Sequence, residues 1–277
     1  MLRLRTSRAV LAGLTMVEIL ILSPIRNMGK TIVDGIAAIG EVVVLLFSTI
    51  KRLPFLPRVM NLTIKQMVSI GVSSLPLLFV TSIFTGMVAT VQAQFQFRNL
   101  VPDKFVGTAA CKMILIELGP ILTALVMAGR VGSALAAEIG TMKEKEELAA
   151  YEVLGLDPLR YLALPRFVAF FVMLPALSVI SNCLALIGGW IVCVLALDIT
   201  SYTYYTGMQY MFDIRDLLSG VLKSFVFGTL IFLLGYHCGL KAGSGAKGVG
   251  FATMNVVVAS CVSILIFDLI VAMLIFN

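Results

Sequence analysis

Residues 106–139 read VGTAACKMILIELGPILTALVMAGRVGSALAAEI, a mostly apolar run with two charges, Glu117 and Arg130, in its interior. About 20 apolar residues are enough for a helix to cross a bilayer, and this run is longer. A charged side chain at the bilayer centre costs about 2.5–3.5 kcal/mol on insertion scales. Chains that keep such residues usually need them in a pathway or in a buried pair. The stretch therefore predicts a membrane protein that moves or senses something.

The composition of the whole chain agrees with a membrane environment. Of the 277 residues, 60% are hydrophobic and 13% are charged, whereas soluble domains carry about 25% charged residues. The apolar runs are too long and too uniform for barrel strands, so the spanning backbone must be helical. We predict an all-α membrane protein with about five transmembrane helices, near residues 69–94, 106–139, 162–196, 217–240 and 250–276.

The N-terminal part has a different pattern. Asp34, Glu41 and Ser48 recur every seven residues and form one polar stripe on an otherwise apolar helix. Such a helix can lie in the membrane interface, although a sixth span over 31–50 remains the alternative. A basic segment with two prolines, KRLPFLPR, follows it. The expected organisation is an N-terminal extension (1–30), an interfacial elbow helix with a basic linker (31–68), and a five-helix domain (69–277).

The basic residues alternate in density from loop to loop. Residues 1–68 hold nine, and the 140–161 and 241–249 loops also hold several, whereas the intervening loops hold few. Because Lys and Arg favour the cytoplasmic side, the N-terminus is predicted to be cytoplasmic and the C-terminus to lie on the opposite side of the membrane. The net charge of +6 therefore reflects membrane topology, and no nucleic-acid partner is expected.

The loop after the second span predicts a short amphipathic helix near 142–154. Lys143 and Glu147 are four residues apart and can pair, while Leu148, Tyr151 and Leu154 form an apolar face. Gly155 is a natural helix stop. The surface around the apolar face is acidic, which argues against anionic lipid and favours docking into a groove on another protein.

The intramembrane charges cannot all be satisfied locally. Glu117 and Arg130 are thirteen residues apart, or about 20 Å along a helix, and point to different sides. Lys223 and Asp268 are the other charges inside predicted spans. Two interpretations stay open: an interhelical pair, such as Glu117 with Lys223, or a polar patch that lines a substrate cavity.

No catalytic or cofactor signature accompanies these features. There is no Ser–His–Asp set, no metal-ligand cluster and no complete phosphate-binding loop, since KAGSGAKGVG lacks the required lysine and hydroxyl pair. The five cysteines lie in or beside apolar runs and form no CxxC pair. We expect no enzyme activity, no cofactor and no metal site in this chain.

The stretch ELGPILTALVMAGRVGSALAAEIGTMKEKEELAAYEVLGLDPLRYLALPR (117–166) closely resembles the MlaE/YrbE permease family. Further matches are LKSFVFG around Lys223 and GVGFATMNVVVAS before Asp268. The resemblance covers roughly residues 31–277. Many relatives carry an arginine directly before the ELGP glutamate, where this chain has Ile116.

The resemblance implies the membrane subunit of an ABC transporter that moves phospholipid or a related lipid between membranes of the cell envelope. It implies a multi-pass protein of the inner (cytoplasmic) membrane, so that the C-terminus is expected to be periplasmic. It implies a second permease copy as a homodimer, a separate cytoplasmic ABC ATPase that hydrolyses ATP, and an MCE-domain protein on the outer face. It also implies that residues 142–154 form the coupling helix that contacts the ATPase. Glu117 and Lys223 match positions near the family's lipid cavity.

Two other functions remain as alternatives. An ion-coupled secondary transporter could use Glu117 as its coupling group, and it would work without an ATPase. A non-transporting membrane scaffold would tolerate the loss of Glu117 and Lys223.

Overall fold

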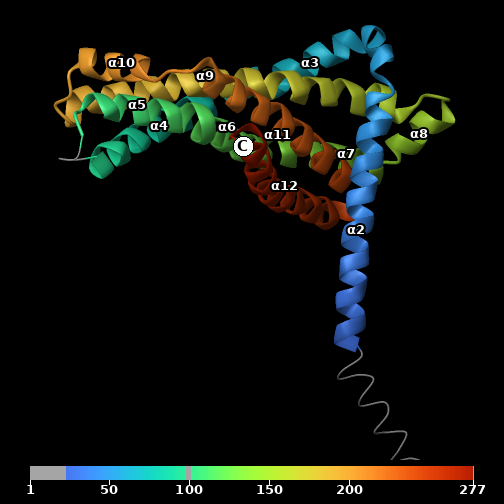
Figure 1. The fold of residues 1–277 in the computed structure, drawn as a ribbon. Helices are drawn as coiled ribbons and strands as arrows, with labels where there is room; N and C mark the ends of the chain where they lie inside the picture. The colour runs from blue at the N-terminus through green and yellow to red at the C-terminus, as the bar shows by residue number, and fades with distance from the viewer. Residues whose placement is uncertain (1–22, 98–100, 277) are drawn as a thin grey trace, which may run out of the picture. The chain divides into compact units, whose positions relative to one another are not determined.

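The computed structural model describes residues 23–97 and 101–276 of the chain, with side chains from residue 33 onward except those of residues 34 and 276. The predicted extension over residues 1–30 thus lies mostly outside the described residues. The described backbone is helical and contains no strand. The chain divides into two units, residues 1–47 and 48–277. The α-helices, labelled in Figure 1, are α2 (Ser23–Ile50), α3 (Met60–Ile70), α4 (Leu75–Phe97), α5 (Lys104–Met113), α6 (Gly119–Met127), α7 (Ser133–Glu144), α8 (Glu147–Val153), α9 (Leu164–Ala196), α10 (Ser201–Tyr210), α11 (Ile214–Leu240) and α12 (Gly245–Phe276).

Five stretches of the described chain are long and apolar enough to cross a membrane, which confirms the predicted number of spans. Short 3-10 or π turns join neighbouring α-helices within the first two of these stretches, and a π turn precedes α9 in the third. All five stretches are longer than predicted. Their bounds are Leu53–Phe97, Lys104–Glu144, Leu159–Ala196, Ile214–Leu240 and Gly245–Ile275. Helix α2 ends in a shorter apolar stretch, Gly35–Ile50. Helix α2 begins at Ser23, earlier than the start at residue 31 that was predicted for the elbow helix.

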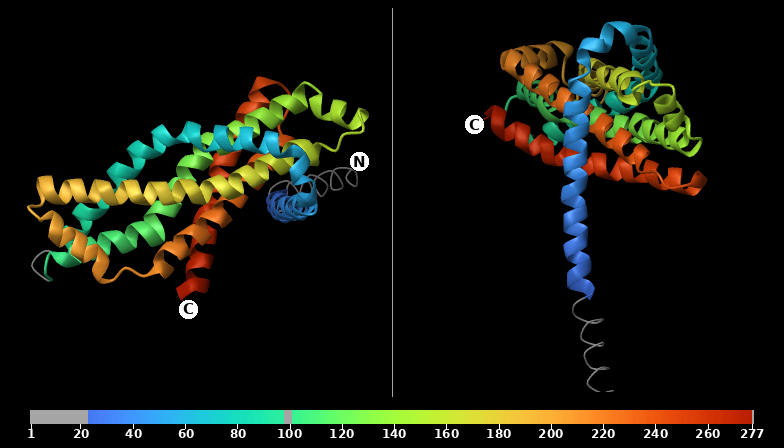
Figure 2. Two further views of the ribbon diagram at one scale, coloured as in Figure 1. Left: turned by 90° about the horizontal axis from the view of Figure 1, so that it is seen from above. Right: turned by 90° about the vertical axis from the view of Figure 1, so that its right-hand side faces the viewer.

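Helix α9 is the centre of the larger unit and packs against α3, α4, α6 and α11. Figure 2 shows it running beside α3 and α4 in the view from above. The contact with α4 is close because both helices present glycine. A Cβ on Gly86 would overlap the carbonyl oxygen of Ala185, and one on Gly188 would overlap that of Ile83. Small residues let two helix backbones approach each other in this way inside a membrane.

The second span follows an unusual backbone path. Two π-helical turns, η4 (Ile114–Leu118) and η5 (Ala128–Gly132), separate α5, α6 and α7. The chain widens into the turn η4 just before Gly119–Pro120 and continues as a helix through Pro120. Proline lacks an N–H and its ring crowds the preceding turn, so a wider turn relieves both problems. Glu117 and Arg130 each lie in one of these π turns.

Polar contacts join segments that are distant in the sequence at both ends of the larger unit. At one end, Lys143 Nζ donates to the carbonyl oxygen of Ala242 at 2.9 Å, and the Arg52 and Asp157 side chains pair at 2.7 Å. At the other end, Thr108 donates to the Gly207 carbonyl oxygen. The loops predicted to share the cytoplasmic side therefore lie together.

Helix α10 closes the other end of the bundle against α5. Tyr204 is 1% exposed there and donates to the Leu186 carbonyl oxygen. Burial raises the pKa of its phenol well above the ordinary value, so Tyr204 acts as a neutral packing residue. Tyr202, Tyr205 and Tyr210 on the same helix are exposed.

Candidate functional site

Three of the four predicted intramembrane charges meet at one point. Lys223 of α11 places its Nζ 2.7 Å from Glu117 Oε1 and 2.8 Å from Asp268 Oδ1. Glu117 comes from η4 and Asp268 from α12, so the cluster joins three helices that are far apart in the sequence. We call Glu117, Lys223 and Asp268 the charged triad. The interhelical pairing of Glu117 with Lys223 is present, and Asp268 joins it.

Glycines allow these helices to come close enough for the triad to form. A Cβ on Gly220 would overlap the Leu115 carbonyl oxygen, so α11 lies directly against the π turn that carries Glu117. A Cβ on Gly119 would overlap Asn182 Oδ1 of α9. The π turn is therefore held between α9 and α11, and the Glu117 side chain reaches the lysine.

The members of the triad differ in exposure. The Lys223 side chain is 0% exposed, that of Asp268 is 16% exposed and that of Glu117 is 39% exposed. Two carboxylates against one ammonium leave one unbalanced negative charge when all three are ionised. A buried charge needs a partner, and Lys223 has two. Glu117 is the member most open to a molecule from outside the protein.

Arg130 does not join the triad. It is exposed on η5, and no carboxylate among the described residues lies within ion-pair distance of it. The predicted group of four charges is thus three charges together and one apart. The reason is geometric, because Glu117 and Arg130 are thirteen positions apart and therefore lie on different turns and sides of the span.

Three buried polar residues of α6 and α9 were not predicted from the sequence as part of the site. Asn182, which touches the Gly119 position, is 2% exposed, and its Oδ1 has no hydrogen-bond partner within the described part of the chain. Ser178, one turn earlier on α9, and Thr123 on α6 share this property. These residues could have been found from the sequence as polar side chains inside apolar spans, because membrane helices keep such residues for interhelical contacts or for ligands.

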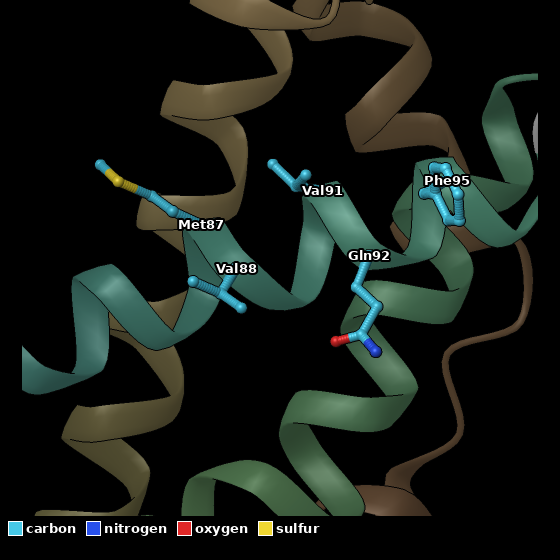
Figure 3. A pocket seen from close by; sticks show the side chains of 5 residues that line it. All are labelled: Met87, Val88, Val91, Gln92 and Phe95. Atoms are coloured by element: carbon cyan, nitrogen blue, oxygen red, sulfur yellow. The ribbon is translucent and has the colours of Figure 1, made fainter.

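An apolar groove lies on the outward face of α4. It has a volume of about 400 Å³ and is lined by Met87, Val88, Val91, Gln92 and Phe95. Figure 3 shows all five side chains on this one helix, with Gln92 as the single polar member. The groove was not predicted from the sequence, because its apolar side chains are also what any lipid-facing helix carries.

The groove and the triad lie on neighbouring elements. Ala89, on the inner side of α4, packs in one buried cluster with Ile114 of η4 and Ala185 of α9. Glu117 is in the same π turn as Ile114. An apolar surface and a charged cluster therefore occur about one helix apart, a combination that suits a molecule with an apolar body and a polar head.

The predicted coupling helix is shorter than expected. Helix α7 of the second span continues to Glu144, and α8 begins only at Glu147 because Glu146 adopts a left-handed conformation with φ of 58°. The helix predicted over 142–154 is thus interrupted. Lys143 bonds to Ala242 instead of pairing with Glu147. Gly155, with φ of 71°, ends the segment as predicted.

The apolar face of this segment is only partly covered. Leu148 and Tyr151 are half-buried, whereas Leu154 is 73% exposed and Val153 is 87% exposed. Exposed apolar side chains at the tip of a loop are typical of a surface that binds another protein. We call Glu147–Leu156 the α8 loop.

Comparison with known proteins agrees with this architecture. The family model described as "Permease MlaE" matches residues 63–274. A probable ABC transporter permease protein of Rickettsia felis is 34% identical over 258 residues, which cover 93% of this chain and 100% of that protein. A probable ABC transporter permease protein of Synechocystis is 37% identical over 215 residues, 78% of this chain and 82% of that protein.

A third relative has a more specific name. The intermembrane phospholipid transport system permease protein MlaE of Haemophilus influenzae is 31% identical over 259 residues, 93% of this chain and 99% of that protein. The five spans and these similarities define a multi-pass membrane permease. The chain belongs to the MlaE permease family.

Proposed function

We propose that this chain is the permease subunit of an ABC transporter that moves phospholipid or a related lipid between membranes of the cell envelope. The observations that carry the proposal are the apolar groove on α4 and the charged triad about one helix away from it, within a chain of the MlaE permease family. The Haemophilus influenzae relative is named as a phospholipid transport permease, and this supports the choice of phospholipid. The protein would lie in the inner membrane, with its N-terminus cytoplasmic.

In the proposed mechanism, acyl chains lie along the groove and the lipid headgroup approaches Glu117. Lys223 and Asp268 hold that carboxylate in position between the helices. Arg130 is apart from the triad and contacts the headgroup or the bilayer surface, since its side chain is exposed. A lipid would bind because its two parts match an apolar surface and a polar one.

The energy source is expected to be a separate ATPase subunit. The α8 loop supplies an uncovered apolar tip between two spans, and ATP binding to the partner would push on it. The relatives named ABC transporter permeases support such a partner. A second copy of this chain and an MCE-domain protein on the outer face complete the proposed assembly, with the exposed tyrosines of α10 as its outer docking surface.

Reconstitution tests this proposal. The purified chain in vesicles should move no fluorescent phospholipid, and the complete complex with its ATPase should do so when ATP is present. Transport by the chain alone that follows a proton gradient would instead establish an ion-coupled transporter. A complete complex that is idle with every lipid class would favour a scaffold.

A matched pair of variants tests the groove. Val91→Trp should fill it and lower the transport rate by about tenfold, since a 1.4 kcal/mol loss of transition-state stabilisation has that effect. Val80→Trp is the control, because Val80 lies on the same exposed side of α4 about three turns away, outside the groove. Equal transport by the two variants would exclude the groove as the lipid path.

A further inference from the structure

A second hollow lies between the start of the first span and the start of the third. It has a volume of about 410 Å³ and is lined by four basic side chains, the Phe55 ring and two prolines. The prolines and Phe55 belong to the 3-10 helix η2 (Leu53–Val59). We call this hollow the basic elbow pocket, and its basic residues are Lys51, Arg52, Arg58 and Arg160.

The pocket carries an excess of positive charge. Asp157 is the one carboxylate within the described residues that pairs with this group, at 2.7 Å from Arg52 and 3.3 Å from Arg160. No described carboxylate lies within 4.0 Å of the Lys51 or Arg58 charge. Four cations against one anion leave a formal charge of +3 around one hollow. Such an arrangement attracts an anion.

The arginines are held in place before any ligand binds. The Arg58 and Arg160 guanidinium groups stack on Phe55, at 5.3 and 5.4 Å from the ring centroid. Arg52 donates to the Ser48 carbonyl oxygen at 2.7 Å. A planar guanidinium binds phosphate oxygens in a two-pronged manner, and less entropy is lost when its side chain is already fixed.

The surroundings of the pocket are apolar. Leu53 and Met60, at the two ends of η2, are 38% and 43% exposed, and η2 begins a stretch long enough to cross the membrane. A ligand here meets cations beside a lipid-facing surface, so it needs an anionic head and an apolar body. Because the exposed apolar side chains belong to the start of a membrane-length stretch, they lie where a lipid tail would be, and the chemistry therefore favours an anionic lipid over a soluble partner protein.

We propose that the basic elbow pocket binds the phosphate of an anionic phospholipid from the cytoplasmic leaflet. This lipid is a fixed component that fastens the start of the first span to the loop after α8. The inference does not rest on the proposed cargo, because the pocket is built by residues other than those of the groove and the triad.

The test uses the full chain in detergent micelles, titrated with dioleoyl phosphatidylglycerol and followed by native mass spectrometry. The double variant Lys51→Gln/Arg58→Gln removes two exposed cations without a carboxylate partner. Its affinity for this lipid should fall by about tenfold or more, as expected for the loss of two basic contacts. Binding of dioleoyl phosphatidylcholine, which has no net charge, should change less than about twofold.

The control variant Lys65→Gln/Lys145→Gln removes the same charge from exposed positions outside the pocket. It should bind phosphatidylglycerol as the unaltered chain does, and an equal loss in both variants would overturn the proposal. Inorganic phosphate that displaces the lipid at equal concentration would show a free-phosphate site and also overturn it. So would unchanged lipid binding combined with loss of the co-purifying ATPase, because the pocket would then be a protein contact. A single symmetric peak in size-exclusion chromatography and an unchanged helical circular-dichroism spectrum verify that the variants fold.

Discussion

At the scale of single residues, Lys223 is held from two sides. Its side chain is fully buried between two carboxylates from two other helices. Removing one member of a buried ion pair leaves its partner uncompensated, which costs about 3–5 kcal/mol in soluble proteins. Lys223 therefore has a structural role in addition to any contact with a substrate, and stability measurements can separate the two roles.

We expect Lys223→Met to lower the stability of the folded chain more than Glu117→Gln does. The first change leaves two carboxylates without a cation, whereas the second leaves Lys223 paired with Asp268. Thermal melting of the purified protein in micelles measures the difference. Adding Asp268→Asn to Lys223→Met should restore part of the loss, because one unpaired carboxylate is then removed.

The control is Lys247→Met, which alters an exposed lysine outside the triad. If Lys223→Met melts at the same temperature as this control, the triad does not stabilise the fold. A transport defect in Glu117→Gln without a change in melting would indicate that Glu117 contacts the substrate directly.

At this scale the sequence identified the charged residues and offered a Glu117–Lys223 pair as one of two interpretations, but it did not assign Asp268 to that pair. Glu117, Lys223 and Asp268 were recognisable because charges are costly in an apolar span. Their meeting at one point, and the separation of Arg130 from them, depend on how three helices pack. Asn182 was not predicted as a site residue, because a single amide in an apolar helix costs less free energy than a charge and so indicates a function less strongly.

At the scale of secondary structure, the close contact of α4 with α9 depends on two glycines. We expect Gly86→Ala to lower the yield of folded protein, because the new Cβ would overlap the Ala185 carbonyl oxygen and push α4 away. Size-exclusion chromatography in detergent measures the folded fraction. Gly129→Ala is the control, since a Cβ at Gly129 meets nothing within 4 Å. Comparable elution profiles for both variants would show that α4 and α9 tolerate a wider spacing.

The α8 loop gives a prediction about the partner subunit. Leu154→Glu places a charge on the exposed apolar tip, so the ATPase should be lost on purification by about tenfold or more, as a few kcal/mol at an interface hot spot would produce. Co-purification with a tagged permease measures it. Ala149→Glu adds the same charge on another side of α8 and should retain the partner. Normal co-purification with Leu154→Glu would remove the loop from the interface.

The predicted helix over 142–154 shows why boundaries are difficult to place from sequence. The pattern of Leu148, Tyr151 and Leu154 correctly located a short helix and its glycine stop. It could not reveal that α7 continues to Glu144 or that Glu146 turns with a positive φ.

At the scale of the whole molecule, five spans and the shared end of the basic loops predict opposite sides for the 140–161 loop and for α10. A cysteine introduced as Gln209→Cys on α10 should react with a membrane-impermeant maleimide from outside the cell. One introduced as Lys145→Cys should react only after the membrane is permeabilised. The unaltered chain gives the background from its native cysteines. Labelling of Lys145→Cys in intact cells would reverse the proposed topology.

The amino-acid sequence by itself determined the helical class, the five spans and the membership in the MlaE permease family. These properties follow from local features, because an apolar run of sufficient length crosses a bilayer regardless of its neighbours. Only the tertiary structure decided that Lys223 joins two carboxylates, that an apolar groove lies on the outward face of α4, and that four basic residues surround one hollow. Residues that are a hundred positions apart meet through helix packing, and the close approach of those helices depends on side chains from several spans at once.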